Sequence, residues 1–129
     1  MSQKLTDEVV KLIEGKNFAH LATLMKDGSP QVTPVWVDHD EDRILINTAV
    51  GRIKEKNVVR DPRVAISIID QSNPYHRVVI RGKVIKMIRR GARDHINKLS
   101  IKYTGHTYNH VQPGETRVIM MIESITNRT

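Results

Sequence analysis

The sequence contains no cysteine and few aromatic residues, with one Phe, one Trp and three Tyr among 129 residues. Without cysteine, the chain forms no disulfide bond and offers no thiolate for catalysis or metal binding. So few aromatic side chains argue against the stacking surface on which single-strand nucleic-acid-binding proteins hold bases. Nucleic acid binding is therefore the weaker interpretation of any basic surface.

Long apolar runs are also missing. No segment approaches the roughly eighteen apolar residues that a membrane-spanning helix needs. The first residues, MSQKLTDEVVKL, lack the apolar core of a signal peptide. A chain of this length holds one domain with one sizeable core, so we expect residues 1–129 to form a single domain. We expect a cytoplasmic protein with no membrane partner.

The charge is unbalanced toward basic residues. The chain has 21 Lys and Arg against 14 Asp and Glu, a net charge of +7. Residues 77–102 hold nine of the basic residues and a single acidic one, Asp94. Such an excess favours an anionic partner, whether nucleic acid, an acidic membrane or a small polyanion. The same segment could equally be an ordinary solvated surface.

Apolar periodicity predicts a mostly β chain with two or three helices. Thr6 can cap a short helix whose apolar stripe ends before Gly15. The pair Asp27 and Gly28 signals a hairpin, the acidic residues 38–42 a turn, and Gly82 a bulge. A longer helix is expected at residues 92–103. Six strands are expected at residues 18–25, 31–37, 43–48, 64–69, 78–88 and 116–125, which favours a small closed or split β-barrel.

The connection at residues 48–63, TAVGRIKEKNVVRDPR, is the most informative segment. Arg52, Lys54 and Lys56 occupy alternate positions just after the apolar run at residues 44–46. Three cations that converge at the end of a strand form a binding site for phosphate. A solvated charged face is the alternative interpretation. One or two helical turns are expected after Asn57, ending before the Pro at position 62.

Residues for acid–base or metal chemistry are less clear. His106 and His110 lie four apart, but turn-forming residues surround them, so we expect a loop and no metal site. No Ser, His and Asp order or paired carboxylates indicate a hydrolase, and no catalytic residue is assigned. Tyr75 and His76, before the fifth expected strand, are candidates for contact with a substrate. The alternative is that both are ordinary loop residues.

Three motifs carry a family resemblance. They are ATL-x-x-DG-x-P-x-x-x-P-V-W at residues 22–36, R-x-K-x-K-N-x-x-R-D-P-R at residues 52–63 and PGE-x-R-V at residues 113–118. Together they resemble the pyridoxamine 5′-phosphate oxidase-like split β-barrel flavoproteins, over nearly the whole chain. Within that group the sequence is most similar to the branch that binds the deazaflavin coenzyme F420.

The resemblance implies a six-stranded split barrel that works as a homodimer, with two cofactor sites at the subunit interface. It implies that Arg52, Lys54 and Lys56 contact the cofactor phosphate and that Thr48 and Asn57 assist through hydrogen bonds. It further implies that the backbone of one hairpin strand faces the cofactor ring, at Gln31, Val32, Thr33 and Pro34.

The function that follows from this resemblance is hydride transfer from F420 to a small-molecule acceptor whose identity stays open. A polyanionic cofactor of this kind suits a chain with a net charge of +7. The first alternative is an FMN-binding flavoprotein, either an oxidoreductase or a flavin-binding module without turnover. A basic nucleic-acid-binding domain is the third interpretation, and it rests on charge alone.

Overall fold

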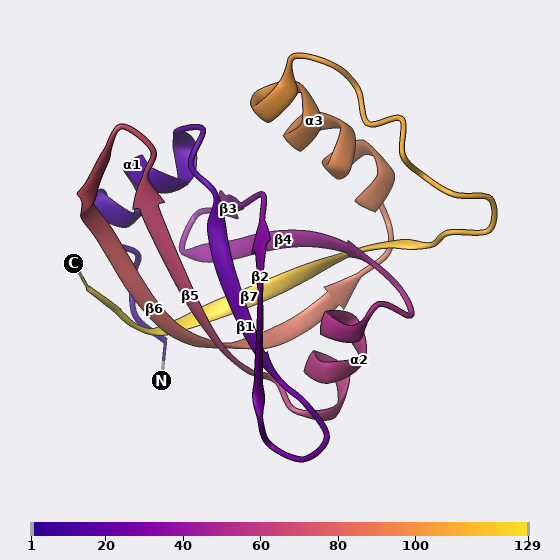
Figure 1. The fold of residues 1–129 in the computed structure, drawn as a ribbon, viewed down its shortest axis with the longest axis horizontal. Coiled ribbons are helices and arrows are strands. Elements are labelled where there is room, and N and C mark those ends of the chain that lie inside the picture. Colours follow the sequence, from indigo (N-terminus) through magenta and orange to yellow (C-terminus); the bar gives the residue numbers. More distant parts are fainter. Residues whose placement is uncertain (1, 129) are drawn as a thin grey trace.

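The computed structural model describes residues 2–128 and contains one seven-stranded antiparallel sheet with three helices (Figure 1). The strands follow the order β2-β1-β5-β6-β7-β4-β3 across the sheet. The helices are α1 (Asp7–Glu14), α2 (Ile53–Arg60) and α3 (Ala92–Thr104). The strands are β1 (Ala19–Leu24), β2 (Pro30–Val35), β3 (Asp38–Asp40), β4 (Arg43–Ala49), β5 (Arg63–Asp70), β6 (Asn73–Ile88) and β7 (Arg117–Arg128).

The mostly β fold is confirmed, but the sheet has seven strands rather than six, and of the closed and split barrels that the sequence favoured, the closed form is wrong. The additional strand, β3, lies where an acidic turn was expected. Glu41 has a φ of 51°, and the tight turn at Glu41 and Asp42 lets Asp40 pair with Arg43 and Asp38 with Leu45. Within residues 2–128, no pairing joins the two edge strands β2 and β3, so the sheet stays open.

Helix α1 and the inner face of the curved sheet form the hydrophobic core. The Thr6 side chain caps α1, since its Oγ1 accepts a hydrogen bond of 3.3 Å from the Val9 backbone N–H. The predicted stripe is buried, with Val9, Leu12 and Ile13 at most 2% exposed, and each such side chain stabilises the fold by about 1.5–3 kcal/mol. The helix therefore closes one end of the core.

Strand β6 pairs with β5 over residues 73–83 and with β7 over residues 79–88, so its middle is bonded on both sides. The register with β7 shifts between Arg81 and Gly82, as predicted for Gly82, but the extra residue is Ile125 on the opposite strand β7. A Cβ atom at Gly82 would clash with the carbonyl oxygen of Glu123. Only glycine lets the two backbones approach this closely.

Helix α2 begins at Ile53, earlier than the sequence predicted. Gly51 has a φ of +95°, a conformation that favours glycine, and Arg52 takes the N-cap position. The Glu55 side chain then accepts a hydrogen bond of 2.7 Å from the Gly51 backbone N–H. These contacts start the helix before Asn57, so the expectation of a helix only after Asn57 is wrong.

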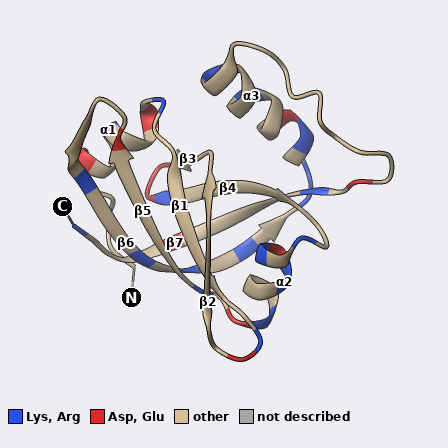
Figure 2. Ribbon diagram, in the orientation of Figure 1, with Lys and Arg blue, Asp and Glu red and all other residues tan. Residues whose placement is uncertain are grey.

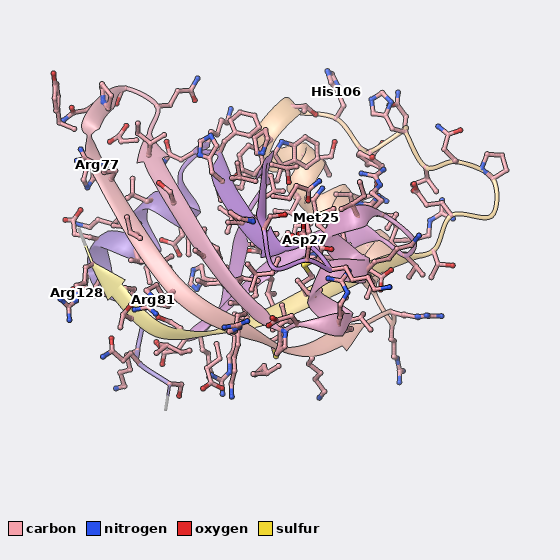
Figure 3. The ribbon with its side chains drawn as sticks, turned by 60° about the horizontal axis from the view of Figure 1, so that its bottom comes forward. Met25, Asp27, Arg77, Arg81, His106 and Arg128 are labelled. Atoms are coloured by element: carbon pink, nitrogen blue, oxygen red, sulfur yellow. The ribbon has the colours of Figure 1, made fainter. Side chains whose placement is uncertain are left out.

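The basic segment at residues 77–102 covers most of β6 and α3 (Figure 2). On β6, the exposed positions alternate and include Arg77, Arg81 and Lys83. Arg128 lies beside them on β7, since it pairs with Val79 (Figure 3). The positive charge therefore forms an extended surface on one side of the sheet. None of the helices described between residues 2 and 128 is both long and apolar enough to span a membrane.

Candidate functional site

A cavity of about 200 Å³ lies where α3 and the chain that follows it cover the ends of β2, β4 and β7. Helix α3 packs on β7 and β4, and Tyr108 from the connection to β7 reaches over the opening. One wall is apolar, with Phe18, Trp36, Tyr108, Ile96 and Leu99. The opposite wall is polar, with Asn47, Thr48, Arg52, Lys54 and Arg117.

The apolar wall includes Phe18, Trp36 and Tyr108, and Tyr103 packs behind it against Phe18 and Trp36. Trp36 and Tyr103 stack with ring centroids 5.3 Å apart, and Phe18 lies 5.6 Å from Tyr103. Tyr108 meets Trp36 edge-on at 6.2 Å. A small number of aromatic residues thus forms one cluster, in which only Trp36 and Tyr103 are parallel.

The polar wall holds three cations and one carboxylate. Glu115 lies 3.5 Å from Arg52 Nη2 and 3.5 Å from Arg117 Nη1, so one carboxylate serves two guanidinium groups. Burial, followed by the charges of Arg52 and Arg117, lowers the pKa of Lys54. The wall keeps a net excess of two positive charges, which suits a phosphate or another multiply charged oxyanion.

Thr48 contributes a buried hydroxyl with no partner. It is 1% exposed, lines the cavity, and its Oγ1 makes no hydrogen bond within residues 2–128. An unpaired buried polar group costs about 1–3 kcal/mol, so a bound ligand oxygen at Thr48 would recover stability. The side-chain oxygens of Gln31 and Thr33 on β2 are also buried without a partner among the described residues. These groups fit a phosphorylated, hydrogen-bonding cofactor.

The structure brings together some of the predicted cofactor residues and separates others. Pro34, Thr48, Arg52 and Lys54 line the cavity, whereas Lys56 does not. Positions two apart on a helix point about 200° apart, so Lys54 and Lys56 extend from different sides of α2.

Asn57 is turned toward the protein interior. It is 1% exposed, and its Nδ2 donates a hydrogen bond of 3.0 Å to Thr23 Oγ1. Gln31, Val32 and Thr33 lie on β2, an edge strand, outside the cavity lining. Val32 is 62% exposed, so its side of β2 is open to a ligand or to another chain.

Comparison with known proteins gives this architecture a family. The model of the family described as pyridoxamine 5′-phosphate oxidase matches residues 5–126. The chain belongs to the pyridoxamine 5′-phosphate oxidase family. The resemblance found in the three sequence motifs is therefore confirmed.

Solved structures agree with this membership. A structure named F420 reductase is 28% identical with a TM-score of 0.86, over 96% of this chain and 98% of that one. A conserved hypothetical protein from Mycobacterium tuberculosis is 21% identical with a TM-score of 0.73, over 98% of this chain and 84% of that one. General Stress Protein 26 from Bacillus anthracis is 15% identical with a TM-score of 0.66, over 94% and 89% of the two chains. The latter two show the shared fold.

Sequence reasoning missed Arg117, Glu115 and Asn47, which this family member places in or beside the cavity. Arg117 Nε donates a hydrogen bond of 2.9 Å to Asn47 Oδ1, across a separation of 70 residues. Arg117 and Glu115 did belong to the PGE-x-R-V motif. The only sign of their role was a charged residue at the start of an otherwise apolar strand.

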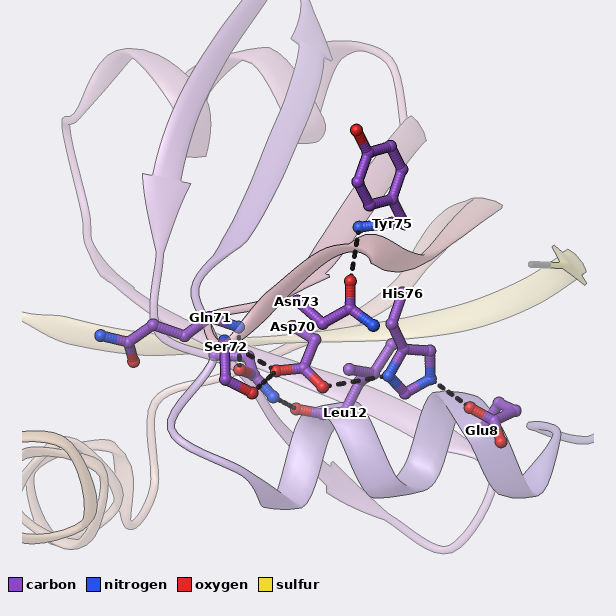
Figure 4. Close-up of polar contacts among 9 residues, drawn as sticks. Glu8, Leu12, Asp70, Gln71, Ser72, Asn73, Tyr75 and His76 are labelled. Carbon is purple, nitrogen blue, oxygen red and sulfur yellow. Dashed lines mark hydrogen bonds and ion pairs between the residues drawn. The ribbon is translucent and has the colours of Figure 1, made fainter.

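Tyr75 and His76 lie within β6, near its start, rather than before the strand as expected, and both are outside the cavity lining (Figure 4). Tyr75 is 86% exposed. His76 lies between two carboxylates, with Nδ1 3.0 Å from Asp70 Oδ2 and Nε2 in contact with Glu8 on α1. The hydrogen bonds to Asp70 and Glu8 raise the pKa of His76. His76 therefore connects helix α1 to the β5–β6 hairpin.

A second hollow, of about 330 Å³, lies on β1, β5 and β6. Its lining includes Ala22, Leu24, Ala65 and Ile125, with Arg63 and Arg81 at its margins. Ile125 is 39% exposed, and Val79 on the neighbouring part of β6 is 50% exposed. The lining of this hollow is therefore partly apolar, and it includes no residue of the helices described within residues 2–128.

Proposed function

We propose that this protein is an oxidoreductase that binds F420 and uses it to transfer a hydride to a small-molecule acceptor. The observation that carries the proposal is the likeness, over nearly the full length of both chains, to the structure named F420 reductase. Family membership supports a flavin-type cofactor more generally. The cavity adds a physical reason, because its cations and aromatic wall suit a phosphorylated ring compound.

The residues of the cavity would hold the cofactor by charge and hydrogen bonding. Arg52 and Lys54 would bind the phosphate, and the Thr48 hydroxyl would donate to one of its oxygens. The β2 backbone near Pro34 would lie against the ring. When bound, the deazaflavin supplies the hydride chemistry, and the protein's part is to bind it, orient it and exclude water.

FMN is the second candidate cofactor, and one observation favours it. The excess of two positive charges at Arg52, Lys54, Arg117 and Glu115 matches the dianion of a phosphomonoester such as FMN. The phosphodiester of F420 carries one negative charge at that position, and the rest of its charge lies in its glutamate tail. That tail would need the basic surface of β6, with Arg77, Arg81 and Lys83.

A fluorescence titration of F420 and FMN at low and high salt separates the two cofactors. If the glutamate tail lies along exposed cations, F420 should bind more tightly at low salt and lose more affinity at high salt, because salt screens exposed charges. FMN affinity should change less. If FMN binds more tightly at every salt concentration, the F420 assignment is wrong and the flavoprotein alternative holds. Oxidation of reduced F420 in the presence of a panel of acceptors then tests turnover.

The proposal includes a homodimer, with a partner that completes each cofactor site. A cavity of about 200 Å³ is smaller than a complete flavin cofactor needs. The exposed apolar residues Val32, Val79 and Ile125 lie on uncovered parts of β2, β6 and β7. Light scattering at micromolar concentration should report twice the monomer mass. A monomer that binds cofactor with full affinity would contradict this part of the proposal.

A further inference from the structure

Arg117 is a buried cation without a close counter-ion. It is 4% exposed, and burial lowers the pKa of its guanidinium group. Among residues 2–128 its only carboxylate contact, to Glu115, is 3.5 Å long and is shared with Arg52. A buried guanidinium normally needs a short, well-aligned carboxylate to offset the loss of hydration. The structure therefore leaves unused capacity for a negative charge at Arg117.

A directed series of hydrogen bonds holds this guanidinium in place. Arginine can only donate, so Arg117 Nε–H fixes the Asn47 carbonyl oxygen as its acceptor at 2.9 Å. The Asn47 amide then donates to the Ala92 carbonyl at 2.8 Å and to His95 Nδ1 at 3.0 Å. With Nδ1 as acceptor, the neutral ring carries its proton on Nε2, which donates to Asp38 Oδ2 at 3.0 Å.

Asp38 ends this series as a stable anion. Burial alone would raise its pKa, but hydrogen bonds from His95 and from the His39 backbone, with the nearby charge of Lys98, hold the pKa at about 2. In the polar chain of Asp38, His95 and Asn47, the hydrogen bonds thus fix which group of each residue donates and which accepts. The arrangement spans β3, α3 and β4 and ends at the first residue of β7.

Arg117 lines the cavity, and part of its guanidinium group has no partner among the described residues. Nε is used by Asn47 and Nη1 by Glu115, whereas Nη2 makes no hydrogen bond to any residue between 2 and 128. The ring of Tyr108 lies 5.3 Å from the guanidinium carbon and limits its movement. Arg117 lines the cavity together with Lys54, whose ammonium group feels its charge.

We propose that Arg117 is an anion-binding residue of the cavity, with Nη2 donating to a phosphate or carboxylate oxygen of the ligand, and that the polar chain of Asp38, His95 and Asn47 positions it. The oxyanion is either the phosphate of the cofactor or an acidic group of the acceptor. The identity of the cofactor rests on the proposed function, whereas the anion site itself does not.

The first experiment measures binding of inorganic phosphate, F420 and FMN to the wild type and to Arg117→Met. Riboflavin and the phosphate-free deazaflavin riboside serve as matched ligands. The variant keeps an unbranched apolar side chain and loses the charge and the guanidinium donors. Phosphate affinity should fall about ten- to a hundredfold, as expected for a lost charge-assisted hydrogen bond. The control is Arg43→Met, which removes an equal charge from a residue that pairs with Glu123 outside the cavity.

The ligand series identifies the source of the anion. A loss for F420 or FMN, with riboflavin and the riboside unchanged, places the cofactor phosphate at Arg117. A loss of affinity for inorganic phosphate alone, measured on cofactor-loaded protein, places an acidic group of the acceptor at Arg117. If Arg117→Met binds every anion as well as Arg43→Met does, or if the wild type binds none, the inference is overturned.

The second experiment tests the positioning role of His95. In His95→Gln the side-chain amide keeps one acceptor for Asn47 and one donor for Asp38, whereas His95→Leu keeps neither. The phosphate affinity of the folded protein should stay within about threefold of wild type in His95→Gln and fall about tenfold in His95→Leu. If both variants bind phosphate equally well, His95 has only a structural role.

A nitrogen-15 spectrum of arginine side chains follows the same site without an enzymatic assay. The Nε–H signal of Arg117, identified by its absence in Arg117→Lys, should shift when inorganic phosphate is added to the wild type. An unmoved signal at saturating phosphate counts against the inference even if Arg117→Met fails to fold. A wild type that binds phosphate through Arg117 but neither F420 nor FMN would leave this inference intact and remove the proposed function.

Discussion

Trp36 and Tyr103 stack almost in parallel, with ring planes 7° apart and centroids 5.3 Å apart. The contact joins the chain after β2 to the end of α3. The Tyr103 hydroxyl adds two hydrogen bonds, donating to the Asn17 carbonyl at 2.7 Å and accepting from the Val37 backbone N–H at 3.2 Å. One tyrosine thus fixes both the aromatic wall of the cavity and the helix that covers it.

Replacing this hydroxyl should destabilise the protein while keeping the stack. In Tyr103→Phe the Val37 N–H loses its partner, so we expect the free energy of unfolding to fall by about 1–3 kcal/mol. Urea denaturation measures the change. Tyr108→Phe is the matched control, because the Tyr108 hydroxyl makes no hydrogen bond within residues 2–128. Equal stability of the two variants would contradict the role given to Tyr103.

Lys54 and Lys56 should differ in their effect on cofactor binding, although they are close in sequence. Lys54 lines the cavity and Lys56 is exposed on another side of α2. We expect Lys54→Ala to weaken cofactor binding about ten- to a hundredfold. Lys56→Ala, the control of equal charge, should change it by less than about threefold. Equal losses of affinity in a titration of both variants would contradict this difference and support the expectation that all three cations contact the cofactor.

Gly82→Ala should destabilise the sheet. Its new Cβ would meet the Glu123 carbonyl, which belongs to the paired backbone of β7 and cannot move freely. A forced shift of this kind costs about 1–3 kcal/mol. Thermal or urea unfolding provides the measurement, with Lys83→Ala on the neighbouring exposed position as control. If Gly82→Ala is as stable as the wild type, the backbones of β6 and β7 can move apart enough to admit the Cβ atom with no loss of folding free energy.

The contact of His76 with Asp70 and Glu8 should make stability depend on pH. The folded-state pKa of His76 lies above its ordinary value of 6.5, so its contribution is fully present below pH 6.5 and is lost as pH rises through the raised value. The pKa of Asp70, about 2, lies below its ordinary value of 3.8, so that contribution is present above pH 3.8 and is lost as pH falls toward 2.

The contact should therefore stabilise the protein most between about pH 4 and pH 6.5. His76→Gln should lower the melting temperature more at pH 5 than at pH 8.5. His20→Gln removes an exposed histidine that makes no ion pair within the described residues, and it serves as control. A melting-temperature difference that is the same at both pH values would show that the ionised contact does not contribute.

Several elements follow from local sequence alone. Thr6 and the stripe of Val9, Leu12 and Ile13 specify α1, because capping and apolar spacing act within a few residues. Gly28 at the β1–β2 hairpin and Gly82 at the bulge mark places where the backbone geometry favours glycine. The three motifs then suffice for the family, since they extend over most of the chain.

The seventh strand and the start of α2 were not predictable in the same way. Strand β3 forms because it pairs with β4. Its three residues, two Asp and one His, have little β propensity of their own. The Asp42 carboxylate also accepts a hydrogen bond of 3.0 Å from the Leu5 backbone N–H, which supports the turn from far along the chain. Contacts of this kind leave no local pattern.

The sequence by itself determined the family, the mostly β architecture and the cations Arg52 and Lys54 beside a strand end. Only the tertiary structure decided which residues share the cavity. The fold brings Arg117 Nε within 2.9 Å of Asn47 Oδ1. It leaves Lys56 outside the cavity lining and points Asn57 toward the protein interior. Local rules act over one or two helical turns, whereas a binding site joins side chains tens of residues apart, whose directions depend on the packing of the whole sheet.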